Sequence, residues 1–286
     1  MILMNLAAGN AQPRSDYDEL FHYGARSSAM GHAIISDGRD AGIMFRNPAA
    51  LAVLQTGSVF FDHRGQAEHA AMGHTLGFVA PTGRNGRLGV AVSANHQGQA
   101  YLAGEGFDAL MYSLTFAQSL LLAQSFSAGV LAETEILKAE RLETLNITTI
   151  LGPHYSPSPE ISYALTLSGV GMSTMLRTNT LHEVELKPQP ATLGIGMSMR
   201  FPSSYDQQDF TLALVNEKQF GTAGLTYRFG IEYYPADVLA LRAGLVSGPF
   251  EQAARFGLGI RTEPFLVDIA YAPGNGRYHV STFIVW

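Results

Sequence analysis

The sequence predicts an all-β protein, a transmembrane antiparallel β-barrel of about 14 strands whose lumen is plugged by an N-terminal segment containing a short helix. Three observations predict this fold. The 286 residues are 47% hydrophobic but only 15% charged, whereas soluble domains carry about 25% charged residues. No run of roughly 20 apolar residues could form a spanning helix. Instead, apolar and non-apolar residues alternate in segment after segment from Gly57 onward.

The composition excludes several other classes of protein. Acidic residues outnumber basic ones by 24 to 18, so no basic patch is available and we expect no nucleic-acid partner. The absence of cysteine excludes a disulfide scaffold, a thiolate zinc site and a cysteine nucleophile.

The chain divides into three regions. Residues 1–12 are apolar and then rich in small residues, which indicates either the remnant of a signal peptide or a disordered terminus. We favour the signal because a membrane barrel requires export. Residues 13–56 form the predicted plug, or hatch, in which Asn47 caps a short helix that Pro48 opens and Ala49 continues. Residues 57–286 form the predicted barrel.

Period-two alternation identifies the individual strands of the barrel. Segments of about 108–117 and 160–170 are typical, and turn sequences such as residues 82–86 and 273–276 separate such segments. A further segment, 191–201, places one apolar set on a single face, namely Leu193, Ile195, Met197, Met199 and Phe201. The opposite faces consist mostly of Gly, Ala, Ser and Thr, which are too poor in charge for a soluble surface and suit a barrel lumen.

Aromatic residues near the segment ends are typical of the girdles at a membrane interface. The predicted girdle residues are Phe201, Tyr155, Tyr163, Tyr227, Tyr233, Tyr234 and Tyr271.

The last segment carries a predicted barrel-assembly signal. Trp286 is the only Trp and the last residue, and residues at intervals of two precede it, including Ile284, Val280 and Tyr278. A terminal aromatic residue with this alternation resembles the signal read by the outer-membrane barrel assembly machinery. The alternative is a strand that merely ends the chain.

Both ends of the sequence resemble one family. Gly24-Ala25-Arg26 through Met30-Gly31, an acidic turn from Asp37 to Asp40 and Asn47-Pro48-Ala49 occur in that order near the N-terminus. The C-terminal third adds segments 230–235, 239–244, 256–261 and 267–271. This ordered set resembles the outer-membrane PorV/PorQ family of the type IX secretion system, which is related to the FadL fatty-acid channels. The resemblance implies a 14-stranded barrel with the N-terminal segment folded into the lumen. Because the chain is short for that family, we expect short extracellular loops.

Charged residues on the predicted lumen face suggest how the plug is held. The set comprises Arg228, Glu232, Arg242, Arg255, Arg261 and Asp268. Since a buried charge needs a partner, we expect these groups to hold the plug through Asp37, Asp40 and its helix end. The alternative is that the arginines line a wet pore.

No pattern indicates catalysis, a metal or a cofactor. Neither a Gly-x-Ser-x-Gly elbow nor a phosphate-binding loop occurs. His63, His69 and His74 are spaced loosely across the first hairpin without carboxylate support, so we expect no metal site. Glu133 and Glu135 share a strand face and are expected to pair with lumen arginines.

The sequence therefore predicts a non-enzymatic, integral protein of the bacterial outer membrane. Its expected function, by resemblance, is as a component or accessory of type IX protein secretion and surface attachment. The alternative is a FadL-like channel for long-chain fatty acids or other hydrophobic small molecules. Expected partners are outer-membrane lipid, the barrel assembly machinery and, for the first function, other secretion proteins or secreted substrate domains.

Overall fold

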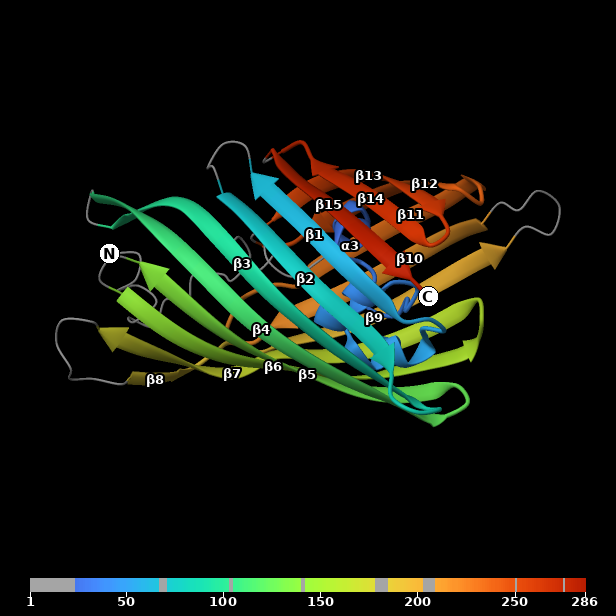
Figure 1. Cartoon of the computed structure of the whole chain (residues 1–286), viewed down its shortest axis with the longest axis horizontal. Coiled ribbons are helices and arrows are strands. Elements are labelled where there is room, and N and C mark those ends of the chain that lie inside the picture. Colours follow the sequence, from blue (N-terminus) through green and yellow to red (C-terminus); the bar gives the residue numbers. More distant parts are fainter. Residues whose placement is uncertain are drawn as a thin grey trace.

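In the part of the chain that the structure describes, fifteen strands form one antiparallel sheet, and all of them except the short β8 close into a 14-stranded barrel. Figure 1 shows the strands wrapped around the barrel. The computed structural model describes residues 24–66, 71–102, 105–139, 142–177, 185–202, 209–249, 251–274 and 276–286. Within these ranges no helix is long and apolar enough to cross a membrane. The predicted region 1–12 and the start of the predicted plug lie outside the described residues.

The barrel strands follow one another around the ring, and β8 lies beside β7 only. Their bounds are β1 Ser58–Gln66, β2 Ala71–Pro81, β3 Gly86–Leu102, β4 Glu105–Ala123, β5 Phe126–Ala139, β6 Leu142–Ser158, β7 Ile161–Arg177, β8 Glu185–Pro188, β9 Thr192–Pro202, β10 Asp209–Gln219, β11 Thr226–Ala236, β12 Leu239–Ser247, β13 Gln252–Thr262, β14 Phe265–Ala272 and β15 Arg277–Val285.

The first and last strands close the ring. β1 pairs with β15 in register from Ser58 opposite Val285 to Gln66 opposite Arg277. Closure pairs every edge of the barrel sheet, which is the condition for placing β-structure in lipid.

The predicted barrel of about 14 strands is confirmed, but several strands are longer than the alternation alone indicates. The segment expected near 108–117 is the strand Glu105–Ala123, and the one expected near 160–170 is Ile161–Arg177. Pairing with equally long neighbours extends these strands beyond their regular alternation.

The two faces of the sheet divide as the alternation predicts. Large apolar side chains face outward and remain well exposed, among them Leu76, Phe78, Leu114, Phe116, Ile195, Leu245, Leu258 and Ile269. The inward face is buried and carries small and polar residues, among them Thr75, Ser93, Thr115, Thr166, Ser198 and Thr211. An apolar exterior on a closed barrel matches the lipid-facing surface of a transmembrane barrel.

One predicted girdle residue lies on the other face. Tyr233 and Tyr234 are consecutive, so they cannot both point outward from a regular strand. Tyr234 is buried in the lumen, where its hydroxyl donates a hydrogen bond to Glu232 at 3.0 Å. Elsewhere in the predicted girdle, Tyr155 and Tyr163 stack on the exterior with ring centroids 6.4 Å apart.

Residues 24–56, which we call the plug, lie inside the barrel (Figure 1). They form the helix α3 Ala25–Ala29 and two 3-10 helices, η1 Ala41–Phe45 and η2 Pro48–Val53. Short helices joined by turns pack into the limited lumen while satisfying part of their own backbone hydrogen bonds.

Candidate functional site

The wall of the lumen is shaped to receive the backbone and side chains of the plug. At seven inward-facing glycines, an added Cβ atom would come between 2.1 and 3.1 Å from a plug atom. These wall glycines are Gly89, Gly129, Gly152, Gly196, Gly230, Gly244 and Gly257. Real Cβ atoms essentially never approach within 3.0 Å, and only Gly89, at 3.1 Å from Met44, lies above that limit. The missing side chains therefore create space that the plug fills.

Arg26 is the centre of the charged contacts between plug and wall. Its Nε and Nη2 donate to Glu232 of β11 at 2.8 and 2.9 Å. Its Nη2 also donates to Asp37 at 2.6 Å, and Nη1 donates to Asp40 at 2.8 Å. Arg26 is 2% exposed and Glu232 is fully buried. A buried guanidinium is stable only with such complete pairing.

The other charged groups of the plug extend this cluster. Arg39 donates to Asp37 at 2.5 Å and forms an ion pair with Glu232 at 2.7 Å. Burial opposes the charge on Arg26, but Asp37, Glu232 and Asp40 outweigh it and raise the pKa of Arg26 well above its usual value. Burial likewise opposes ionisation of Asp37, but Arg26 and Arg39 lower the pKa of that carboxyl well below its usual range. Arg26 and Asp37 are therefore both charged at neutral pH.

Two of the predicted lumen charges continue the cluster along the wall. Arg242 donates to Glu232 at 2.7 Å and to Asp268 at 2.6 Å. Asp268 is thereby linked to the plug through Arg242 and Glu232.

The remaining predicted arginines lie apart from that cluster. Arg228 donates to Glu217 at 2.7 Å and to the Gly31 carbonyl at 3.4 Å. Arg255 bonds to the His32 ring, while Arg261 lies over the Tyr234 ring at 4.5 Å. Arg228 and Arg255 thus contact the plug corner formed by residues 28–32, and Arg261 packs against a wall residue.

The pairing differs from the arrangement we expected. Wall arginines were expected to bind Asp37 and Asp40, whereas these two carboxylates bind arginines of the plug itself. The wall instead contributes the carboxylate of Glu232, which pairs with Arg26 of the plug. Sequence reasoning missed Arg26, although a charged residue within the small-residue stretch 24–31 is itself a signal of a buried partner.

A second plug–wall contact pairs Arg46 with Glu217 of β10, a carboxylate that Arg228 also contacts. Neither Arg46 nor Glu217 was among the expected lumen charges. Both are polar residues at ordinary strand and helix-end positions, so nothing in the sequence separates them from solvated residues.

Asn47 ties two parts of the plug together. Its Oδ1 accepts a hydrogen bond from the Ala49 amide at 3.1 Å, and its Nδ2 donates to the Ile35 carbonyl at 2.9 Å. Pro48 occupies the first position of η2. Ala49 packs against the wall at Gly129, and its carbonyl accepts a hydrogen bond from Ser127.

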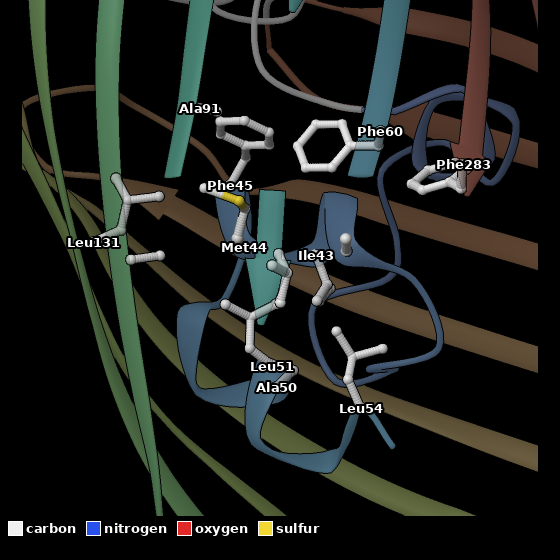
Figure 2. Close-up of a cluster of buried hydrophobic side chains, with 13 residues drawn as sticks. Ile43, Met44, Phe45, Ala50, Leu51, Leu54, Phe60, Ala91, Leu131 and Phe283 are labelled. Atoms are coloured by element: carbon white, nitrogen blue, oxygen red, sulfur yellow. The ribbon is translucent and has the colours of Figure 1, made fainter. Parts of the chain in front are cut away.

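A large apolar cluster also joins the plug to the wall. Figure 2 shows Met44, Phe45 and Leu51 of the plug packed with side chains of the barrel wall. The rings of Phe45 and Phe60 meet edge to face with centroids 6.1 Å apart. Beside these two rings lies a cavity with room for about one water molecule. The plug is therefore held both by ion pairs and by close apolar packing.

The predicted barrel-assembly residues lie in or directly after β15. Tyr278, Ile284 and Trp286 are exposed on the outer face, and Val280 is partly buried. Trp286 stacks on Phe78 with ring centroids 5.8 Å apart, and its backbone pairs with Gly57. Whether the assembly machinery reads these residues stays a prediction.

The described residues bring serine and histidine together twice inside the lumen, at Ser27 and His32 within the plug and at Ser127 and His154 of the wall. The wall pair is not in a catalytic arrangement. Ser127 lies 3.5 Å from His154 Nδ1, and His154 Nε2 lies 2.9 Å from the Ser36 carbonyl. The Ser127 hydroxyl donates to the Ala49 carbonyl. Both side chains thus bind the plug backbone, and the contact is structural.

Other residues considered above have identifiable neighbours. Glu133 accepts a hydrogen bond from Thr115 at 3.1 Å, and Glu135 lies 3.4 Å from the Asn146 amide. Within the described ranges no three His, Asp or Glu side chains are grouped as metal ligands. His63 and His74 do come together, whereas His69 lies outside the described residues.

Comparison with known proteins gives matches at the level of structure only. No family model and no curated protein matches the sequence. Among solved structures, the toluene transporter TbuX of Ralstonia pickettii is 14% identical with a TM-score of 0.62, over 94% of this chain and 98% of that one. The toluene transporter TodX of Pseudomonas putida is 11% identical with a TM-score of 0.64, over 93% and 97%. A FadL homologue of Pseudomonas aeruginosa is 12% identical with a TM-score of 0.56, over 92% and 98%.

The fold and the exterior together define the class of protein. The chain is an integral outer-membrane β-barrel with 14 strands and the fold of FadL-like barrels. The narrower PorV/PorQ resemblance stays a prediction from sequence.

Proposed function

We propose that the protein is a FadL-like outer-membrane channel for hydrophobic small molecules, with the plug as its hatch. The observation that carries the proposal is the plug itself. It is buried in the lumen of the barrel, and its described residues form no β-ladder with the strands of the wall. A solute that crosses through this lumen requires the plug to move. The similar solved structures, which include the toluene transporters TbuX and TodX and the monoaromatic hydrocarbon channel CymD, support hydrophobic solutes.

The contacts of the plug allow such a movement. Its polar contacts with the wall are made by side chains such as Arg26, Arg46 and Ser36, and by single backbone groups. The backbone ladders of β1 to β15 do not include it. The plug can therefore leave its place without opening the barrel sheet.

The type IX secretion function rests on sequence resemblance alone. It predicts stable partner proteins, whereas a channel for small molecules predicts uptake by the protein alone. Purification from native membranes separates the two functions, since co-purified secretion proteins would support the first.

A disulfide lock tests the hatch directly because the chain contains no cysteine. Ser36 of the plug and Ser198 of β9 have side-chain oxygens 2.6 Å apart, close to the separation of about 2.0 Å between disulfide sulfurs. The variant S36C/S198C therefore ties the plug to the wall. The matched variant S162C/S198C ties two wall strands, because those oxygens lie 3.1 Å apart.

The measurement is the initial rate of labelled toluene uptake by Gram-negative cells that express each variant or an empty vector. We expect S36C/S198C to fall to the vector rate when oxidised and to recover with reductant. Uptake by S162C/S198C should not depend on the redox state. Uptake through the oxidised S36C/S198C protein at the reduced rate would contradict a moving hatch, and wild-type uptake at the vector rate would contradict a channel for this solute class.

A further inference from the structure

Two histidines meet on the outer face of the first hairpin. His63 of β1 and His74 of β2 lie directly opposite each other in the antiparallel register. Their Nδ1 atoms are 3.2 Å apart, and their ring centroids are 4.7 Å apart. His63 lies three residues before Gln66, the last residue of β1, so the pair is near the end of the hairpin strands.

Neighbouring rings hold both imidazoles in place. The Tyr278 hydroxyl of β15 lies 3.4 Å from His63 Nε2. On the other side, Phe61 stacks on His74 with ring centroids 5.9 Å apart. A group that contacts the second ring nitrogen orients the first, as happens around metal-bound histidines.

We propose that His63 and His74 form a two-imidazole site for a divalent transition metal, with Cu²⁺ bound most tightly. Metal–nitrogen bonds of about 2.0–2.1 Å place two ligand nitrogens about 2.9 Å apart at a right angle and about 3.4 Å apart at a tetrahedral angle. The observed 3.2 Å lies between these separations. Water completes the coordination.

The order of affinities follows from the ligands. Imidazole nitrogens suit Cu²⁺, Ni²⁺ and Zn²⁺, and among divalent first-row ions Cu²⁺ binds such sites most strongly. Mg²⁺ prefers oxygen ligands and does not compete. No thiolate in this chain competes for the metal, because the sequence contains no cysteine.

A bound metal would join two strands next to the seam of the barrel. It bridges β1 to β2, and His63 also contacts Tyr278 of β15, the strand that closes the ring against β1. A ligand that binds only the folded state raises the unfolding temperature. The site is therefore expected to stabilise the pairing of β1 with β2, independently of any transport.

The test is a Cu²⁺ titration of the full-length protein in detergent micelles, followed by electron paramagnetic resonance and by the unfolding temperature. The variants are His63→Ala, His74→Ala and the double variant, with Met72→Ala as the control. Met72 is the next outward residue of β2 and is 45% exposed.

We expect one site in the wild type and in Met72→Ala whose spectrum shows two coupled nitrogens. Each histidine variant should bind Cu²⁺ at least tenfold more weakly with one coupled nitrogen, and Cu²⁺ should no longer raise its unfolding temperature. A hydrogen bond between the two rings also fits the 3.2 Å contact and needs no metal. Equal Cu²⁺ binding by the wild type and the double variant would therefore overturn the proposal, and so would a His74→Ala spectrum identical to that of the wild type.

Discussion

The Arg26 guanidinium and the Glu232 carboxylate form a two-point ion pair across 206 positions of the sequence, with contacts of 2.8 and 2.9 Å. One partner belongs to the plug and the other to β11. Because Arg242 and Arg39 contact the same carboxylate, Glu232 is the junction between the charges of the plug and those of the wall. Loss of this one carboxylate therefore affects the whole cluster.

Replacement of Glu232 by Gln should loosen the plug while leaving the barrel folded. The change preserves the shape of the side chain but removes one counter-charge from each of Arg26, Arg39 and Arg242. Breaking a buried ion pair costs about 3–5 kcal/mol. In planar bilayers we expect a higher ion conductance than that of the wild type. The matched control is Glu143→Gln, which breaks an exposed pair with Lys138 at 3.8 Å and should change little. Equal conductance of the two variants would show that Glu232 does not hold the plug.

A methyl group on the lumen wall should displace the plug corner. A Cβ atom on Gly244 would lie 2.1 Å from the Gly31 nitrogen and 2.3 Å from the Met30 carbonyl carbon. Both are backbone atoms, so no side-chain rotation relieves the contact. We expect Gly244→Ala, in the S36C/S198C background, to lower the yield of the plug–wall disulfide severalfold.

The control for this substitution is Gly274→Ala, because a Cβ atom there meets nothing within 4 Å. Its disulfide yield should equal that of the parent variant. An undiminished disulfide yield in Gly244→Ala would mean that the wall moves to accommodate the methyl group, which would contradict a rigid contact between Gly244 and the plug.

Substitutions of Asn47 should separate its two roles. Loss of a helix cap costs about 1 kcal/mol, and a buried carbonyl left without a partner costs about 1–3 kcal/mol. Asn47→Ala removes both the cap to Ala49 and the hydrogen bond to Ile35, whereas Asn47→Ser retains a capping hydroxyl only. Thermal unfolding can be followed by gel mobility. The midpoint temperature should be highest for the wild type, lower for Asn47→Ser and lowest for Asn47→Ala. If Asn47→Ser unfolds at the same midpoint as the wild type, the hydrogen bond to the Ile35 carbonyl does not stabilise the protein.

The faces of the strands could be predicted from sequence because alternation is a local property of an extended chain. Ile195 was assigned to the apolar face and Arg255 to the lumen face, and the structure places the first outward and the second in the lumen. The additional strand β8 and the length of β4 could not be predicted in this way. They depend on pairing with neighbouring strands, which the pattern of a single segment does not contain.

Which charged side chains pair with one another in the lumen was harder to predict from sequence. The expectation that lumen charges meet the plug needed only the cost of an unpaired buried charge. The pairing of Arg26 with Glu232 additionally requires the path of the plug across the lumen, which no local pattern describes. Similarly, His63 and His74 meet because of the exact register of β1 and β2, and a shift of one residue would separate them.

An arginine on the outer face tests the orientation of the barrel in lipid. Leu258 lies near the middle of β13, is 52% exposed and is flanked by the outward residues Leu241 and Ile269. Arginine at the midplane of a bilayer costs a barrel about 2–4 kcal/mol, and about 0–1 kcal/mol near the interface. Leu258→Arg should therefore lower the free energy of unfolding from vesicles by the larger amount. Val238→Arg is the control, since Val238 is equally exposed but lies in the turn between β11 and β12. If the two substitutions destabilise the protein equally, the apolar band around Leu258 does not face the lipid.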